Sequence, residues 1–187
     1  MLGKLVGSCI FAGCLVTLPP ASGAQQIIHA LTGTVSMIDT HSGTITVLED
    51  NHSTGVFQRG GKTPSSFDKR IASETTAADS FDKSGAYTIV FYCGDGDDRE
   101  AVALKSLGTG PFTSTEGTVE KFDRGHSIAV RDSAGTTHVF NLIETTVAET
   151  NFGAVPAKKF SADKGDHVRV VSSTESGTPT ALFVRDL

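Results

Sequence analysis

The second half of the chain repeats the pattern of the first half. Residues 32–58, TGTVSMIDTHSGTITVLEDNHSTGVFQ, align with EGTVEKFDRGHSIAVRDSAGTTHVFN at an offset of 84 that falls to 83 after the first turn. The remainder aligns at an offset of 80, where Gly85 meets Gly165 and Leu107 meets Leu187. A repeat of this kind constrains the fold more than any single motif. We therefore expect a tandem duplication, with copies at 30–108 and 114–187.

Short apolar stretches in each copy are separated by turns rich in Gly, Asp, Asn and Ser. Apolar residues stand two apart at Ile45/Val47 and Ile128/Val130, a spacing typical of strands rather than helices. The predicted strands are 32–38, 44–49, 54–58, 86–93 and 101–106 in copy one, and 116–122, 127–131, 136–142, 166–172 and 180–186 in copy two.

Five strands in so short a copy predict a small closed or partly open sheet, because closure removes exposed edges. The expected fold class is therefore all-β, with two tandem five-stranded OB-like barrels formed by internal duplication. Domains of this size bury only about 60% of their unfolded surface, so we expect the copies to pack against each other.

One predicted strand conflicts with its counterpart. In copy two, His167 and Arg169 occupy outward positions, whereas the aligned positions of copy one hold apolar Tyr87 and Ile89, followed by Phe91. We expect this strand of copy one to be buried on both faces, the outer one against copy two or another subunit. Self-association through residues 87–91 therefore stays open.

Copy two carries a series of short motifs in a fixed order. They are Gly-x-Val, Phe-x-Leu, Thr-x-Val, Lys-Gly-Asp-x-Val-x-Val and Ala-x-x-Val, here Gly117, Val119, Phe140, Leu142, Thr145 or Thr146, Val147, Lys164 to Val170, and Ala181 to Val184. The series resembles that of small exported bacterial domains of unknown function with an OB-like barrel. It covers copy two nearly end to end and copy one with a divergent middle. The resemblance implies a periplasmic or cell-surface β-barrel and carries over no catalytic residue.

The N-terminus has the features of a secretory signal peptide. Lys4 is followed by an apolar run from Leu5 to Leu18, a Pro-Pro break and small residues that end at Ala24. The run is short for a membrane span. We expect residues 1–24 to be removed and the protein to be exported, to the periplasm or the extracellular space. In the alternative interpretation, FAGC is a lipoprotein box and Cys14 is the lipid anchor.

The charge balance argues against nucleic acid as a partner. The chain has 16 lysines and arginines against 21 acids, and loss of the leader with Lys4 changes the net charge from −5 to −6. A surface of that sign repels phosphate backbones, and no basic cluster overrides it. Beyond the leader, no other apolar run approaches membrane length, so we expect no membrane span after signal cleavage.

Cys93 is the only cysteine beyond the leader. An exported chain with one thiol cannot close an internal disulfide. The thiol is either a small buried hydrophobic group, as is usual for an unpaired cysteine that ends an apolar strand, or a reactive or intermolecular group.

An acidic run follows this cysteine in YCGDGDDREA, with carboxylates at Asp95, Asp97, Asp98 and Glu100. Four carboxylates so close together repel one another and could collect a hard cation, and calcium prefers oxygen ligands. The run lacks the full ligand spacing of an EF-hand loop, so a solvated turn is the favoured explanation. Weak calcium binding through residues 95–100 is the alternative function, and these four residues are the candidate metal ligands. We expect no other cofactor.

Hydrolase chemistry is a further alternative. Ser, His and Asp lie mostly in turns, as in DTHSG at 39–43 and DRGHS at 123–127, and there is no Gly-x-Ser-x-Gly motif. The six histidines show no His-x-x-x-His spacing of the kind that zinc sites use. We therefore expect no catalytic residues.

The sequence favours an exported, non-enzymatic protein that is a binding or structural module of the cell envelope. Its expected partner is an envelope protein, a glycan or a small ligand. OB-like barrels commonly bind on the face formed by strands two and three and their loops. In copy one these loops include EDNHSTG at 49–55 and the segment 59–84.

Overall fold

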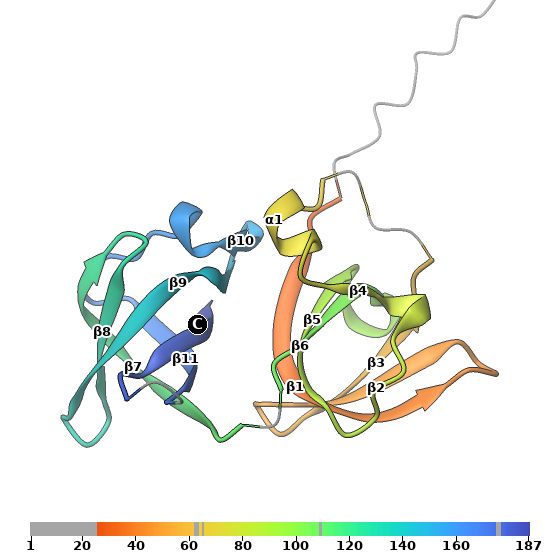
Figure 1. Ribbon diagram of the computed structural model, residues 1–187, viewed down its shortest axis with the longest axis horizontal. Coiled ribbons are helices and arrows are strands. Elements are labelled where there is room, and N and C mark those ends of the chain that lie inside the picture. The colour runs from red at the N-terminus through yellow and green to blue at the C-terminus, as the bar shows by residue number, and fades with distance from the viewer. Residues whose placement is uncertain (1–25, 62–63, 65, 109, 175–176) are drawn as a thin grey trace, which may run out of the picture.

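The structure is a computed structural model that describes residues 26–61, 64, 66–108, 110–174 and 177–187. The expected signal peptide, residues 1–24, and the alternative anchor Cys14 lie outside these residues. Within the described residues, no helix is both long enough and apolar enough to cross a membrane. The fold is all-β, and two sheets lie side by side (Figure 1).

Each sheet takes its strands from one half of the chain. The N-terminal half contains β1 (His29–Asp39), β2 (Thr44–Glu49), β3 (Thr54–Arg59), α1 (Lys69–Ala72), β4 (Thr76–Ala77), η1 (Ala78–Ser80), β5 (Tyr87–Cys93), η2 (Gly96–Asp98) and β6 (Glu100–Ser106). The C-terminal half contains β7 (Phe112–Asp123), β8 (Ser127–Asp132), β9 (Thr137–Thr150), β10 (Gly153–Pro156), η3 (Ala157–Lys159), β11 (His167–Ser173) and β12 (Thr180–Asp186).

The C-terminal sheet is a closed five-stranded barrel, and β10 pairs with the end of β9. The neighbouring strands follow the order β9-β12-β11-β7-β8, and β8 pairs again with β9 to close the ring. All of these pairings are antiparallel except β9 with β12, which run parallel. Closure leaves none of the five strands with a free edge along its whole length.

The N-terminal sheet has the order β3-β2-β1-β5-β6-β4. Its two ends also meet, because β3 and β6 run parallel over two residue pairs, Gln58 with Glu100 and Arg59 with Ala101. The backbone N–H of Gly60 continues this contact by donating to the carbonyl of Ala101. The parallel contact is much shorter than the one between β9 and β12, which spans Thr180 to Arg185 of β12.

The first strand of each sheet bends at the same point of its pairing. The register of β1 against β2 shifts between Val35 and Met37, and that of β7 against β8 shifts between Val119 and Lys121. Such β-bulges increase local twist and redirect a side chain. Glycine precedes both bends, because a Cβ on Gly33 or Gly117 would clash with the carbonyl of the neighbouring strand.

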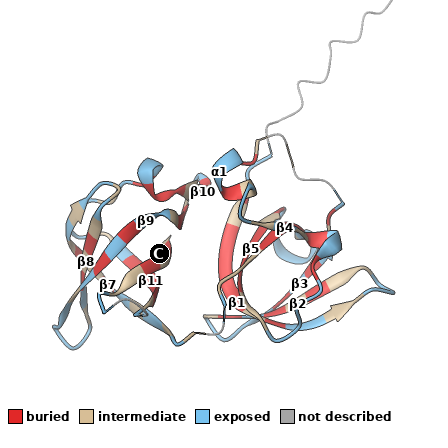
Figure 2. Cartoon of the chain, in the orientation of Figure 1, coloured by how far each residue is buried: buried red, intermediate tan, exposed pale blue. Residues whose placement is uncertain are grey.

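Buried apolar side chains form three clusters. One lies inside the N-terminal sheet around Phe57, and another lies inside the barrel around Phe160. The third joins the halves: Ile89 and Phe91 of β5 pack with Val147, Val171 and Phe183 of the C-terminal half, which confirms that the two halves pack against each other. Figure 2 shows buried residues along the strands and exposed residues in the turns.

Polar side chains add a second set of contacts at the junction. The carboxylate of Glu149 accepts hydrogen bonds from the His29 ring (2.7 Å) and the Ala30 backbone N–H (2.7 Å). Burial raises the pKa of Glu149, although both hydrogen bonds oppose the shift. Nearby, Asp50 accepts from Thr32 (2.6 Å) and from the Tyr87 hydroxyl (2.8 Å).

Most predicted strands agree with the structure, but β1 begins at His29 rather than 32 and β7 at Phe112 rather than 116. The short strands β4 and β10 were not predicted, and the largest boundary error lies in β9. The sequence placed the end of the third strand of copy two at residue 142, whereas β9 continues to Thr150. The backbone is irregular where the Ile143 N–H donates to the Thr146 hydroxyl, which itself donates to the carbonyl of Ala181. This irregularity interrupts the apolar alternation, so the sequence pattern stops before the strand does.

Strand β5 has the two buried faces expected from its sequence. Val90 contributes to the core of the N-terminal sheet, whereas Ile89 and Phe91 face the C-terminal half. The apolar surface that left self-association open is therefore covered within the chain. Cys93 ends the strand as a free, buried thiol, which confirms the interpretation of this residue as a small hydrophobic group.

Candidate functional site: the outer face of β1, β2 and β3

Three aliphatic side chains are exposed together on the outer face of the N-terminal sheet. Met37 pairs with Thr46 on β2, and Thr46 pairs with Val56 on β3, so Met37 and Val56 lie on either side of Thr46 in one row across the sheet. Leu48 lies two residues from Thr46 on the same face. Met37, Leu48 and Val56 are each about half exposed, at 54%, 48% and 48%.

The strands place these residues outward because their alternate positions fill the core. Ile45, Val47 and Phe57 are fully buried between the exposed positions of β2 and β3. The bulge after Val35 turns Met37 toward solvent. We call this surface the N-face, defined by Ser36, Met37, Thr46, Leu48, Thr54, Val56 and Gln58. These seven residues carry no charge.

A hollow of about 570 Å³ adjoins the N-face at Met37. Its opposite wall is the segment around Phe81, which the Arg59 side chain fixes in place. The Arg59 guanidinium donates to the backbone carbonyls of Ala78 (2.9 Å), Asp79 and Phe81 (3.2 Å). Arg59 is therefore a structural brace of the hollow, and its hydrogen bonds leave it poorly placed to bind an anion.

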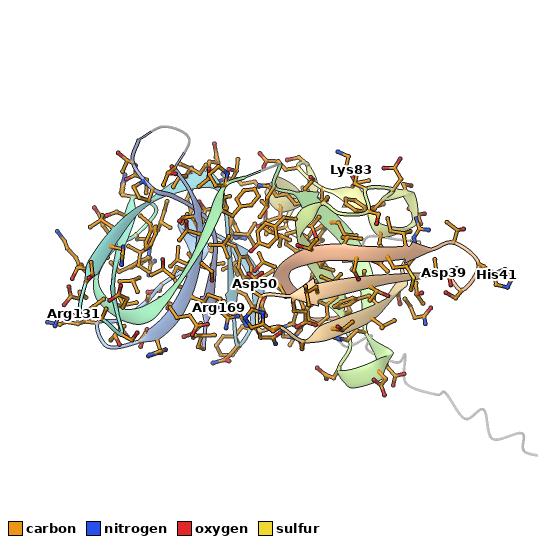
Figure 3. All side chains as sticks on the ribbon, turned by 90° about the horizontal axis from the view of Figure 1, so that it is seen from below. Asp39, His41, Asp50, Lys83, Arg131 and Arg169 are labelled. Atoms are coloured by element: carbon orange, nitrogen blue, oxygen red, sulfur yellow. The ribbon has the colours of Figure 1, made fainter. Side chains whose placement is uncertain are left out.

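The turn between β1 and β2 borders the N-face at the tip of the hairpin. Asp39 accepts hydrogen bonds from the backbone N–H groups of His41 (2.8 Å) and Ser42 (3.1 Å). Hydrogen bonds from the Ser42 side chain and from these two N–H groups lower the pKa of Asp39. Figure 3 shows Asp39 and His41 at one end of the molecule and Arg131 at the other, with Asp50 and Arg169 close together between them.

The equivalent face of the barrel, here called the C-face, has different chemistry. Lys121, Ala129 and Val139 form its row across β7, β8 and β9. Arg131 pairs with Glu120, which also accepts a hydrogen bond from the Thr137 hydroxyl (2.7 Å). The Thr137 hydrogen bond and then the Arg131 charge hold the pKa of Glu120 below its usual value. The C-face therefore exposes one large apolar side chain, Val139 at 52%, beside Lys121 and a group of polar side chains that satisfy one another.

The candidate metal ligands Asp95, Asp97, Asp98 and Glu100 all lie exposed around η2. In the part of the chain that the structure describes, no group of three or more His, Cys, Asp or Glu side chains is arranged to hold a metal ion. Arg99, in the middle of the run, anchors the turn instead. It donates to the carbonyl of Gly96 (3.1 Å) and to Glu49 (2.9 Å), and its guanidinium lies 4.3 Å from the centre of the Phe57 ring.

The described residues include two His–carboxylate pairs, one at the junction of the two halves and one on the barrel. His29 bonds to Glu149 at the junction, and His138 bonds to Asp132 (2.8 Å) on the barrel. Among the described side chains, neither pair has a serine, threonine or cysteine within hydrogen-bond distance of the imidazole. The sequence predicted none of these four residues as partners, because they are separated by up to 120 positions and follow no motif.

Comparison with protein-family models and with curated proteins finds no match to this chain. The sequence pointed to strands two and three, but it did not single out Met37, Leu48 or Val56. The signal was available in principle, because these are apolar residues at outward positions of strands whose inward positions are already apolar.

Proposed function

We propose that the protein is an exported, non-enzymatic binding module of the bacterial cell envelope that consists of two OB-like barrels formed by duplication. The strand pairings support the OB-like assignment. In the N-terminal half β1 pairs with β2 and β5, and β3 runs parallel to β6; in the C-terminal half β7 pairs with β8 and β11, and β9 runs parallel to β12. The common bulge in β1 and β7 supports the duplication.

The N-face is the proposed binding surface, and its three exposed apolar side chains, Met37, Leu48 and Val56, are the observation on which the proposal depends. Contiguous exposed apolar residues on a soluble domain mark interaction sites, whereas single ones are ordinary. The centre of a protein interface is poor in charged residues, and methionine adapts to partners of different shape. The N-face has no aromatic ring on which a base could stack and no cation for a phosphate. The chemistry therefore favours an envelope protein that presents an aliphatic segment over a nucleotide or a charged small ligand.

Paired substitutions on the two faces test this proposal. Met37→Lys with Leu48→Arg gives the N-face the residues found at the same pairing positions of the C-face, and Lys121→Met with Arg131→Leu makes the reverse change as a control. We expect the wild type and the C-face variant to capture the same protein from an envelope extract. The N-face variant should lose at least about tenfold in affinity, equivalent to about 1.4 kcal/mol.

Both pairs change exposed positions, so the free energy of unfolding should stay within about 0.5 kcal/mol of the wild type. Equal capture by the two variants would remove the N-face from consideration. Capture of the chain itself would identify the partner as a second copy. Mass spectrometry of the mature N-terminus tests the export part separately: cleavage after Ala24 is the expected result, and a lipidated Cys14 would indicate a lipoprotein.

A further inference from the structure

The most exposed large apolar residue lies away from both faces. Phe152 is 88% exposed at the tip of the turn between β9 and β10. The turn holds it there, because the Thr150 hydroxyl accepts from the Phe152 N–H (3.1 Å) and donates to the carbonyl of Gly153 (3.0 Å). The Phe152 side chain is not part of the core, whereas Val155 on the following strand is half buried.

Phe152 borders a hollow of about 630 Å³ at the point where the chain enters the fold. Ile27, which is half exposed, and the buried Phe67 form part of its wall. The contact is built into the fold: the N–H of Ala154 donates to the carbonyl of Ile28 (2.7 Å), and the Ser66 hydroxyl donates to the carbonyl of Gln26 (3.1 Å). Figure 1 shows α1, β10 and the start of β1 together at this end of the molecule.

Basic side chains lie on the two short helices beside this apolar surface, and two of them, Lys69 and Lys159, line the hollow itself. Lys69 and Arg70 extend from α1, and Lys158 and Lys159 extend from η3. All four are exposed. Among the described residues, two carboxylates pair with them, Asp68 with Lys159 and Glu144 with both Arg70 and Lys158. The region is therefore locally positive in a chain whose net charge is −5.

The sequence before this end of the fold is the most apolar of the chain. Leu18, the last residue of the leader's apolar run, precedes Gln26 by eight residues, which reach at most about 30 Å when extended. A leader held in the membrane, before cleavage or in the lipoprotein alternative, would therefore keep this end of the fold close to the lipid surface.

We propose that Phe152, Ile27 and the four neighbouring basic side chains form a membrane-docking patch for an anionic lipid surface. Phe152 and Ile27 enter the boundary between headgroups and acyl chains, and the lysines and Arg70 contact anionic headgroups. This arrangement of apolar tip and basic rim is typical of peripheral membrane binding. It leaves the N-face free, so docking and partner binding are separate properties of the molecule.

Tryptophan fluorescence tests the docked orientation directly, because the chain contains no tryptophan. Phe152→Trp introduces one at the exposed tip, and Met37→Trp introduces one on the N-face as a matched control. With vesicles of phosphatidylglycerol and phosphatidylcholine, we expect a blue shift of emission for Phe152→Trp alone. No shift, or the same shift for both variants, would overturn the proposal.

Vesicle sedimentation tests the two components of the patch. Phe152→Ser should lower the partition coefficient at least about tenfold, because burial of a phenylalanine side chain is lost. Lys158→Gln with Lys159→Gln should also weaken binding by about tenfold or more, since each basic group near an anionic surface contributes about fivefold. Lys83→Gln with Lys164→Gln removes the same charge from turns before β5 and β11 and should have little effect.

Two further outcomes would contradict the proposal. Equal binding to pure phosphatidylcholine vesicles would show that the basic rim has no role. A blue shift of Phe152→Trp that grows with protein concentration in the absence of lipid would instead assign the patch to contact between two copies of the chain.

Discussion

Leu48 and Arg131 occupy the same place in their two sheets. Each lies on the second strand and pairs with a threonine on either side, Thr34 and Thr54 for Leu48, Thr118 and Thr137 for Arg131. The backbone arrangement therefore does not require either residue type. On the C-face the charge of Arg131 is satisfied within the chain, whereas Leu48 contacts solvent.

The two faces separate the surface features that the fold requires from those that need another explanation. A polar outer face is what a soluble barrel needs, and the C-face meets that need through Glu120, Arg131 and Thr137. The N-face has the same pleat and bulge but exposes three large apolar side chains, whereas the C-face row exposes one, Val139. The fold accepts charged side chains at the matching positions of the C-face. Binding of a partner therefore explains the exposed apolar side chains of the N-face better than a requirement of folding does.

The largest expected effect comes from breaking the junction on which both halves depend. Phe91→Ala should lower the free energy of unfolding by about 3–5 kcal/mol, because it empties a cluster that contains residues of both halves. Hydrogen exchange should then accelerate in β5 and also in β11 and β12. Phe160→Ala is the matched control, because its cluster contains only residues of the barrel. If Phe91→Ala loosened the N-terminal sheet alone, the halves would be energetically independent.

A second prediction compares how each half holds the acid at the end of its second strand. Glu49 is buried and pairs with Arg99, whereas Asp132 pairs with the more exposed His138. Arg99→Ala should cost about 2–3 kcal/mol, because it leaves a buried carboxylate unpaired and removes a cation from the Phe57 ring. His138→Ala should cost less than about 1 kcal/mol. Urea unfolding of both variants measures the difference, and equal losses would contradict it.

The periodic parts of the fold could be predicted from the sequence, and the side-chain partners could not. Strand β2 has the predicted boundaries because its alternation is regular, whereas β9 extends eight residues further because Thr146 carries an irregularity within it. The charge run at 95–100 was visible, but the role of Arg99 depends on Glu49, which is distant in the chain. Polar pairs such as His29 with Glu149 follow no local pattern, since tertiary packing alone brings them together.

A third prediction uses pH to separate the junction from the C-face. Burial raises the pKa of Glu149 above its usual value of 4.5, so the folded chain binds this proton more tightly than the unfolded chain. Its contribution to stability is present below about pH 4.5 and is lost as the pH rises through the raised pKa. Glu149→Gln should therefore remove this loss of stability above pH 4.5, which amounts to about 1.4 kcal/mol for each tenfold difference in proton affinity between the folded and unfolded chain.

Glu120 and Asp132 on the barrel show the opposite sign. Hydrogen bonds from Thr137 to Glu120 and from His138 to Asp132 lower their pKa values. Their contributions are present above the usual values of 4.5 and 3.8, and are lost as the pH falls through the lowered ones. Glu120→Gln should change only this acidic limb of the profile. A profile altered above pH 4.5 by Glu120→Gln but not by Glu149→Gln would contradict the assignment.

The smallest expected effect concerns the turn between the last two strands, where the halves differ most in charge. A calcium site with a dissociation constant of about 1 mM would stabilise the chain by about 1.4 kcal/mol at 10 mM calcium. We expect a smaller change, equal to that in magnesium at the same ionic strength, because Asp95, Asp97, Asp98 and Glu100 are exposed and Arg99 already anchors the turn. Thermal unfolding of the wild type and of Asp97→Asn with Asp98→Asn measures this. Calcium-specific stabilisation that is lost in the double variant would make the turn a cation site that the second half lacks, and the halves would then differ in function at two places.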